Sequence, residues 1–361
     1  MTKSEKLAKG GLTIVLILGI ILSLACTAKN QGSSGGSSHK TKTIYIYEIL
    51  ESKAAKQTST RSSSVSRVRG IASESIIEES PNIKGVTRVT DFKGERDISY
   101  PTVSRDGSFI VFSLYDSKTK GVNIWKKNVN GQGLTRLTKG PYVDIYPIVS
   151  RDGKYVFFSS NRAGTYNIWR IKITGGGGLT RITTHRNRDF APVQSFDGMR
   201  LAFHSYSVGD PTPQIWICRL DGTSLTQLRI GYRPKWNKNG RKLLYLAPNE
   251  MGKSSQSSSI FLKGKNYDVW EMDIDGTSTT QLSSGYDVFN ADYTKSGKII
   301  FSATNINAKK KNKDIWIGKT QITTNPSDDD YPSFDDQGHL FFRSNRGYSW
   351  DYWKTEMIES E

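Results

Sequence analysis

The chain has 361 residues, a hydrophobic fraction of 35% and a formal net charge of +17 at pH 7. This length can bury a sizeable core, and 33 glycines with abundant tryptophan and tyrosine favour short strands and tight turns over a helical bundle. Two cysteines exclude a disulfide framework, and neither has a neighbour at zinc-ligand spacing. The basic charge would suit nucleic acid, anionic lipid or acidic glycan, but no nucleic-acid-binding motif accompanies it. We therefore expect a solvated basic surface and no nucleic-acid partner.

Residues 1–25 have the pattern of an export signal. Lys3, Lys6 and Lys9 form a positive segment, and residues 12–25 form an uncharged apolar run. This run is too short to span a bilayer as a helix, which takes about 20 residues. The pattern predicts a cleavable signal peptide over residues 1–25.

The next segment has the composition of a tether. Leu22-Ser-Leu-Ala-Cys26 resembles a bacterial lipobox. That resemblance implies that Cys26 receives a diacylglyceryl group and becomes the new N-terminus, and Thr27 after it implies sorting to the outer membrane. An ordinary secreted protein and an uncleaved signal anchor are the alternatives. Gly, Ser and basic residues dominate much of the chain between Cys26 and the repeats, so we predict a lipid-anchored, low-complexity linker over residues 26–82.

Residues 83–357 contain six copies of one repeat, spaced 41 to 57 residues apart. Each copy has an anchor residue and, six positions later, a glycine. The anchors are Pro101, Pro147, Pro192, Pro234, Ala291 and Pro332, and the glycines are Gly107, Gly153, Gly198, Gly240, Gly297 and Gly338. In the copy Ser150-Arg-Asp-Gly153, side-chain oxygens can bond backbone amides, and glycine can take the left-handed conformation that closes a hairpin. A repeat of this period indicates a propeller or another repeat architecture.

The strands behind these turns predict closely stacked sheets. An apolar run follows each glycine, as in Tyr155-Val-Phe-Phe158, and such runs indicate strands covered on both faces. The next strand of each copy carries one tryptophan: Trp125, Trp169, Trp216, Trp270, Trp316 and Trp353. These rings could form a ligand-stacking surface, but packing between neighbouring sheets is the interpretation we favour. Alternating Leu and Thr, as in residues 134–138, predicts a five-residue outer strand with one exposed face.

The two ends of the repeat region complement each other. The sixth copy ends at Met357 without a fourth strand, and the missing sequence, Val86-Thr-Arg-Val-Thr90, stands before the first copy. Pairing the two would leave no open edge between the first and last blades. We predict an all-β, six-bladed β-propeller, closed by an N-terminal strand that completes the last blade and preceded by the signal peptide and flexible linker. The shortened turn at Gly318 and Lys319 predicts an irregular fifth blade.

The repeat also resembles a known family. Its pattern is Asp-x-x-Pro-x-x-Ser-x-Asp-Gly, then Ser-Asn-Arg-x-Gly-x-x-Asn-Ile-Trp, then Leu-Thr-Arg-Leu-Thr, which is similar to the WD40-like (PD40) repeats of the TolB family. TolB is a soluble periplasmic protein that binds a peptidoglycan-associated lipoprotein through its propeller. The resemblance implies a non-enzymatic scaffold of the cell envelope that recognises an envelope protein or peptidoglycan-associated partner. We expect a monomer, anchored by lipid in the outer membrane and facing the periplasm or the cell surface.

We expect the partner on the face formed by the loops that precede each proline strand. Acidic residues stand in those loops, and a basic run stands in a long loop of blade 5. These candidates are Asp97, Asp144, Asp189, Asp328, Asp329 and Asp330, with Lys309, Lys310 and Lys311. An acidic centre with a basic rim could steer a protein partner. The alternatives are strand capping by these residues, or a structural cation in the channel; no other cofactor and no other metal are expected.

A propeller enzyme acting on polysaccharide or peptide, a lyase or a hydrolase, is the alternative function. Known arrangements of that kind need a separate hydrolase domain, an arginine triad or clustered histidines for a metal. His185, His204 and His339 stand in three different copies, and a structural role is the interpretation we favour for each. We therefore assign no catalytic residue and expect no enzymatic activity.

Overall fold

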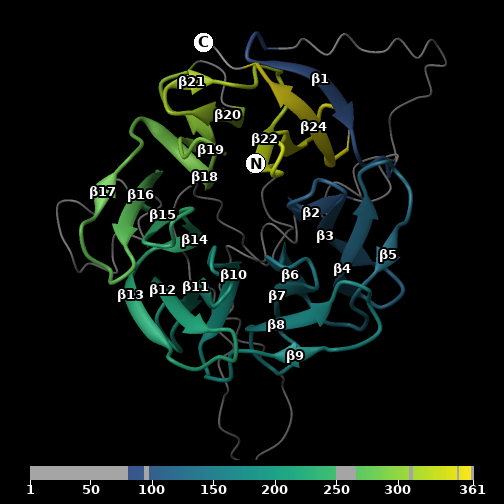
Figure 1. The fold of residues 1–361 in the computed structure, drawn as a ribbon, viewed down its shortest axis with the longest axis vertical. Helices are drawn as coiled ribbons and strands as arrows, with labels where there is room; N and C mark the ends of the chain where they lie inside the picture. The colour runs from purple at the N-terminus through teal and green to yellow at the C-terminus, as the bar shows by residue number, and fades with distance from the viewer. Residues whose placement is uncertain (1–79, 93–96, 249–265, 309–311, 348, 359–361) are drawn as a thin grey trace, which may run out of the picture.

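The computed structural model describes residues 80–92, 97–248, 266–308, 312–347 and 349–358. These residues form six four-stranded antiparallel sheets, arranged as blades around a central channel (Figure 1). The described ranges contain no helix that is long and apolar enough to cross a membrane. The expected signal peptide and Cys26 lie outside them. The predicted all-β, six-bladed propeller is confirmed.

The strands of each blade are given in order from the channel outwards. Blade 1 has β2 (Ile98–Val103), β3 (Phe109–Asp116), β4 (Gly121–Asn128) and β5 (Thr135–Arg136), and blade 2 has β6 (Asp144–Val149), β7 (Tyr155–Ser160), β8 (Asn167–Lys172) and β9 (Thr180–Arg181). Blade 3 has β10 (Arg188–Gln194), β11 (Arg200–Tyr206), β12 (Pro213–Arg219) and β13 (Thr226–Ile230), and blade 4 has β14 (Tyr232–Trp236), β15 (Lys242–Pro248), β16 (Tyr267–Asp273) and β17 (Thr280–Gln281). Blade 5 has β18 (Tyr286–Tyr293), β19 (Ile299–Asn305), β20 (Asp314–Ile317) and β21 (Thr320–Gln321), and blade 6 has β22 (Asp329–Phe334), β23 (Leu340–Ser344), β24 (Asp351–Met357) and β1 (Ile83–Arg88).

The closure of the ring agrees with the prediction. β1 pairs antiparallel with β24, with Ile83 opposite Met357 and Arg88 opposite Trp353. The first strand of the chain is therefore the outermost strand of the last blade, as the colours at the two ends of the ribbon show in Figure 1. This pairing covers the edge that β24 would otherwise present to solvent.

The hairpin turn of the repeat has the bonding that its residues predict. In blade 1, Ser104 Oγ lies 2.6 Å from Asp106 Oδ1, and the amide of Phe109 donates to Ser104 Oγ at 3.1 Å. Gly107 has φ +70°, in the left-handed region, and its amide donates to the Ser104 carbonyl at 2.9 Å. The hydrogen bond from Ser104 is the largest influence lowering the pKa of Asp106, so this carboxyl is held in its charged form.

The outer strands of blades 1, 2, 4 and 5 are shorter than predicted, whereas β13 and β1 have five and six residues. Only two residues form the ladder in β5, β9, β17 and β21. The cause is visible in blade 1, where the Ile124 amide donates to Thr138 Oγ1 at 2.8 Å and the Leu137 amide donates to the Ile124 carbonyl at 2.8 Å. The threonine hydroxyl thus replaces a backbone acceptor, and the chain leaves the sheet early. Blade 5 keeps all four strands despite its shortened turn.

The core is divided into clusters that adjoining blades share. Trp270 lies in one buried cluster with Ile215 and Ile217 of blade 3, and Trp353 lies in one with Ile300 of blade 5. The corresponding tryptophans of the other blades each belong to, or pack against, a cluster that adjoining blades share: Trp125, Trp169, Trp216 and Trp316. The tryptophans therefore occupy positions between sheets, away from the channel.

Candidate functional site

Two of the predicted acidic residues hold buried arginines. Asp144 and Asp329 are fully buried. Asp144 accepts a hydrogen bond from Arg162 Nη2 at 2.7 Å, and Asp329 accepts one from Arg346 Nη2 at 2.7 Å. Each arginine is the last residue of a Ser-Asn-Arg segment. In blade 6, the Arg346 Nε also donates to Ser344 Oγ at 2.9 Å. The arginine of the Ser-Asn-Arg motif thus holds the aspartate at the start of the inner strand of the same blade.

Asp189 and Asp330 are also enclosed by protein. Asp189 accepts hydrogen bonds from Thr183 Oγ1 at 2.5 Å and Ser205 Oγ at 2.7 Å, and burial raises its pKa to about 7. Asp330 pairs with Arg343 at 2.6 Å. Burial disfavours its charge, but the Arg343 and Lys313 cations still hold the pKa of Asp330 below its ordinary value.

The contacts of the acidic candidates favour the strand-capping alternative for the buried ones. Asp144, Asp189, Asp329 and Asp330 are 0–2% exposed and serve contacts within the propeller. The reason is positional: the start of an inner strand is enclosed by its own blade and its neighbour, so polar groups there must find partners inside the protein. Asp97 and Asp328 are half-buried, and each accepts a backbone N–H, from Trp350 at 3.2 Å and Lys313 at 2.9 Å. Lys309, Lys310 and Lys311 lie outside the described residues.

The histidines occupy three separate environments. His204 is buried among aromatic rings and accepts a backbone N–H at 3.3 Å, and burial holds its pKa well below the usual value. His185 lies 3.3 Å from Asp189, and His339 lies 2.7 Å from Asp335. Among the described residues, no three His, Cys, Asp or Glu side chains are grouped as metal ligands would be.

The inner strands share a strained bulge that narrows the channel. The residue before the proline has φ between +49° and +55° in five blades, and the strand register shifts there. These residues are Tyr100, Tyr146, Ala191, Arg233 and Tyr331. A left-handed conformation is costly for residues with a Cβ, by about 1–3 kcal/mol, and persists where surrounding contacts enforce it. The proline after each of them has no N–H to leave unpaired on the channel side.

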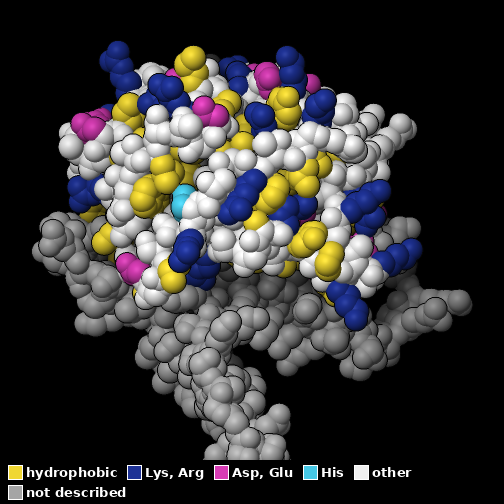
Figure 2. All heavy atoms as spheres, turned by 90° about the horizontal axis from the view of Figure 1, so that it is seen from below, with side chains coloured by type: hydrophobic (Ala, Val, Ile, Leu, Met, Phe, Trp, Pro, Cys, Tyr) yellow, Lys and Arg dark blue, Asp and Glu magenta, His cyan; other side chains and the backbone are white. Residues whose placement is uncertain are grey.

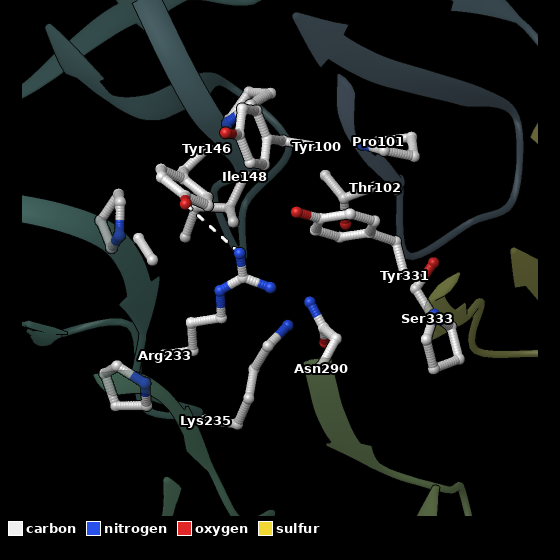
Figure 3. Close-up of a pocket in the computed structure, with 15 residues that line it drawn as sticks. Tyr100, Pro101, Thr102, Tyr146, Ile148, Arg233, Lys235, Asn290, Tyr331 and Ser333 are labelled. Carbon is white, nitrogen blue, oxygen red and sulfur yellow. Dashed lines mark hydrogen bonds between the residues drawn. The ribbon is translucent and has the colours of Figure 1, made fainter. Parts of the chain in front are cut away.

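The bulges bring three tyrosines and one arginine together in the channel. The rings of Tyr100 and Tyr146 lie 4.0 Å apart between centroids, and Tyr331 meets Tyr100 edge-on at 5.7 Å. Arg233 Cζ lies 5.6 Å from the Tyr146 ring centroid and 5.5 Å from that of Tyr331, and its Nη1 donates to the Phe289 carbonyl at 2.5 Å. Figure 3 shows this group, which we call the tyrosine–arginine plug, around a hollow of about 60 Å³.

A larger cavity, the funnel, adjoins the plug at the other ends of the inner strands. Its volume is about 340 Å³, and all six blades contribute to it. Thr102, Ile148, Lys235 and Ser333 line both hollows, so the funnel and the plug are consecutive stretches of one channel. The funnel opens where the inner strands end, which is opposite to the face we expected from the sequence.

The mouth of the funnel is built from the variable position of the hairpin turn. In the pattern Ser-x-Asp-Gly, x is Arg105, Arg151, Phe196, Lys238, Lys295 and Asp336 in blades 1 to 6, and all six residues line the cavity. We call them the turn ring. Position x plays no part in the turn, so the repeat pattern does not mark it as functional. The sequence nevertheless carries a signal of this cluster, since four of the six residues at position x are cationic.

Charge at the mouth is only partly neutralised. Arg105 pairs with Asp336 at 3.0 Å, and Lys235 pairs with Asp292 at 2.9 Å further in. Arg151 lies with its Cζ 3.3 Å from the Phe196 ring centroid, a separation that suits parallel stacking. Burial, followed by repulsion from Arg105, lowers the pKa of Arg151 to about 10, so the side chain stays cationic at neutral pH while partly removed from water.

The basic side chains of the outer wall are arranged differently. On the side of the propeller that Figure 2 shows, Lys and Arg are scattered among neutral and apolar side chains and do not form one continuous patch. The turn ring, by contrast, gathers four cations around one cavity. Positive charge is thus more closely grouped at the funnel than on the wall that this view shows.

The family match agrees with the architecture. Residues 81–266 match the family described as the TolB beta propeller domain (PD40), whereas no curated protein matches the chain. A protein described as TolB from Agrobacterium tumefaciens is 19% identical, with 75% of this chain and 78% of that chain covered and a TM-score of 0.45. TolB from Acinetobacter baumannii is 14% identical over 71% of this chain and 65% of its own, with a TM-score of 0.49. An oligogalacturonate lyase from Vibrio parahaemolyticus is 11% identical over 76% and 94%, with a TM-score of 0.52. At these identities the likeness is one of fold.

Proposed function

Because the chain belongs to the TolB β-propeller family, we propose that it is a non-enzymatic binding scaffold of the cell envelope. It recognises a protein or cell-wall partner through one face of the propeller. The signal-like residues 1–25 and the lipobox-like sequence at Cys26 support export and lipid anchoring in the outer membrane. A β-propeller hosts many functions, so the family supports this role and does not by itself decide it.

The observation that carries the proposal is the turn ring around the funnel. Arg105, Lys238, Lys295 and Asp336 are exposed side chains, in contrast to the buried acidic residues at the other ends of the inner strands. The cavity between them has charged and apolar walls, as a protein recognition site requires. The plug behind it leaves a hollow of only about 60 Å³, which favours docking of a protruding segment over passage of a chain.

The binding face can be tested by photo-cross-linking in the native host. A benzophenone amino acid replaces Phe196 at the mouth or, as a control, Val208, which is 76% exposed in the β11–β12 loop on the opposite face. We expect an adduct of one defined partner, identified by mass spectrometry, from position 196 and not from position 208. Adducts from position 208 alone would move the site to the other face. No adduct from either position, together with turnover of a polysaccharide by the purified protein, would support the enzyme alternative.

Anchoring is tested separately. Cells grown with labelled fatty acid should incorporate the label into the full chain and not into Cys26→Ala, because only the thiol of that residue can accept the lipid. Cys218 is buried and provides the matched control, since Cys218→Ala should keep the label. Absence of label from the unmodified chain contradicts the lipid anchor and leaves the binding role of the funnel untouched.

A further inference from the structure

Arg151 is a half-buried cation of the funnel without a direct ion pair, although the charges of Asp336 and Asp292 act on it from further away. Among the described residues, none forms an ion pair with its guanidinium or accepts a hydrogen bond from it, whereas Arg105 and Lys235 have carboxylate partners. Its backbone amide is held by Gln194 Oε1 at 2.7 Å, and its side chain rests on Phe196. The residue is therefore positioned at both ends while its N–H groups remain available.

A guanidinium held in this way matches one kind of ligand group. Stacking on a ring occupies the faces of the guanidinium and leaves its edge, where the N–H donors lie, for a planar acceptor. A carboxylate accepts two parallel hydrogen bonds from such an edge. It would also supply the direct anionic partner that Arg151 lacks in its partly dehydrated position, where charge interactions are stronger than in water.

We propose that the funnel binds an acidic side chain of a protruding peptide segment of the partner, with Arg151 as its main contact. This inference rests on the proposed function and names the chemistry of the partner. A volume of about 340 Å³ is at the lower end of the range of ligand pockets, so the funnel holds a short segment and not a domain.

The apolar walls favour a peptide over an acidic sugar. Val103, Val149, Val193, Trp236 and Phe334 line the cavity beside the cations. A sugar would bring several hydroxyl groups against these walls, and each buried hydroxyl without a partner is unfavourable. The one amide side chain of the lining, Gln194, already uses both ends, because its oxygen accepts from the Arg151 amide and its nitrogen donates to the Gly198 carbonyl at 2.8 Å. An acidic residue between apolar neighbours fits both features.

The test uses the full chain and calorimetric titration with the peptide acetyl-Leu-Glu-Leu-amide. Its matched probe is acetyl-Leu-Gln-Leu-amide, and digalacturonate represents an acidic glycan. We expect the Glu peptide to bind at least about tenfold more tightly than the Gln peptide, since charge-assisted pairing supplies that difference. Arg151→Gln should weaken binding of the Glu peptide at least about tenfold. Arg219→Gln, at the exposed end of β12, should leave it unchanged, and thermal unfolding should show both variants folded.

Three results would overturn the inference. These are equal affinity for the two peptides, no binding of the Glu peptide up to about 5 mM, and binding of the Glu peptide that Arg151→Gln does not change. Preferential binding of digalacturonate would also reject a peptide ligand. The cross-linking experiment separates this failure from failure of the proposed function. If position 196 still captures the partner with unchanged yield when Arg151 is Gln, the scaffold stands and the carboxylate contact does not.

Discussion

At the residue scale, the arginines of the propeller divide by their partners. Arg162 and Arg346 are almost enclosed and pair with fully buried aspartates, so they are part of the scaffold. Arg105 has an exposed partner, and Arg151 has none among the described residues. The same residue type therefore serves packing where a buried carboxylate faces it and keeps its N–H groups available where a cavity does.

The buried pair of blade 6 should be costly to break. Removing Arg346 leaves the charge of Asp329 in a dry site, and such uncompensated burial typically costs about 3–5 kcal/mol. We expect Arg346→Ala to lower the free energy of unfolding by that amount in urea titrations. Arg105→Ala is the matched control, because the Arg105–Asp336 side chains are 48% and 58% exposed and such pairs contribute about 0–1 kcal/mol. Similar losses in the two variants would contradict a scaffold role for the buried pair.

Asp314 should make stability depend on pH. Burial, followed by the nearby charge of Asp329, raises the pKa of Asp314 to about 7. The folded chain then keeps a proton that the unfolded chain releases near pH 4, so this residue's contribution to stability is lost as pH rises from about 4 to about 7. In Asp314→Asn, urea titrations should show a smaller fall in stability over that interval. Asp106→Asn is the control, and its effect on the pH dependence of stability should have the opposite sign. The pKa of Asp106 is lowered, so its carboxylate contributes stability above about pH 4 that this variant lacks. An unchanged pH profile in Asp314→Asn would refute the assignment.

At the element scale, the hairpin turn performs two tasks with adjacent residues. Its serine, aspartate and glycine form the bonds that close the turn, as Ser104 and Asp106 do in blade 1. The residue between serine and aspartate takes no part in those bonds and instead lines the funnel. The turn can therefore keep its geometry while the chemistry of the mouth changes from blade to blade.

Substitution of two glycines of these turns can distinguish the cost of backbone strain from the cost of a steric clash. Gly107 and Gly153 have nearly the same φ, +70° and +69°. A Cβ on Gly107 would lie 2.5 Å from Asp335 Oδ2, whereas a Cβ on Gly153 would meet nothing within 4 Å. We expect Gly153→Ala to cost about 1–2 kcal/mol for the left-handed conformation, and Gly107→Ala to cost a further 1–3 kcal/mol, roughly, for the clash. Chemical denaturation measures both, and equal costs would show that blades 1 and 6 adjust freely at this contact.

At the scale of the whole molecule, one short strand joins the two ends of the ring. β1 contributes Ile83 and Val86 to a cluster that also contains Ile300 of blade 5 and Trp353 of blade 6. It also covers the edge of β24. Stability of the ring thus depends on a segment that lies far from the last blade in sequence.

Removal of β1 should open the ring. A chain without residues 1–91 exposes the N–H and C=O groups of β24 and the apolar surface beneath, so we expect a lower melting temperature and concentration-dependent association. The matched control lacks residues 1–79 only and keeps every residue that the structure describes in the propeller. Scanning calorimetry and light scattering distinguish the two chains. The same melting temperature for both would show that closure contributes little to stability.

Much of the fold was predictable because its determinants are local and repeated. The glycine at a fixed distance from each proline and the displaced fourth strand at residues 86–90 predicted six blades and their closure. The length of the outer strands was not predictable, since the Thr138 hydroxyl replaces a backbone acceptor only in the folded geometry. The sequence left strand capping by the acidic residues as an alternative to partner binding for a related reason: burial of Asp144 and Asp329 depends on the neighbouring blade.

The sequence by itself determined the turns, because they result from short-range chemistry. It also determined the number of blades and the closing strand, because the repeat can be counted and its missing fourth strand stands before the first copy. Only the tertiary structure decided which face carries the larger cavity and which residues surround it. The six members of the turn ring are far apart in sequence and meet because the inner strands end at one mouth. The charge of Arg151 becomes significant there, beside Phe196 and without a direct ion pair among the described residues.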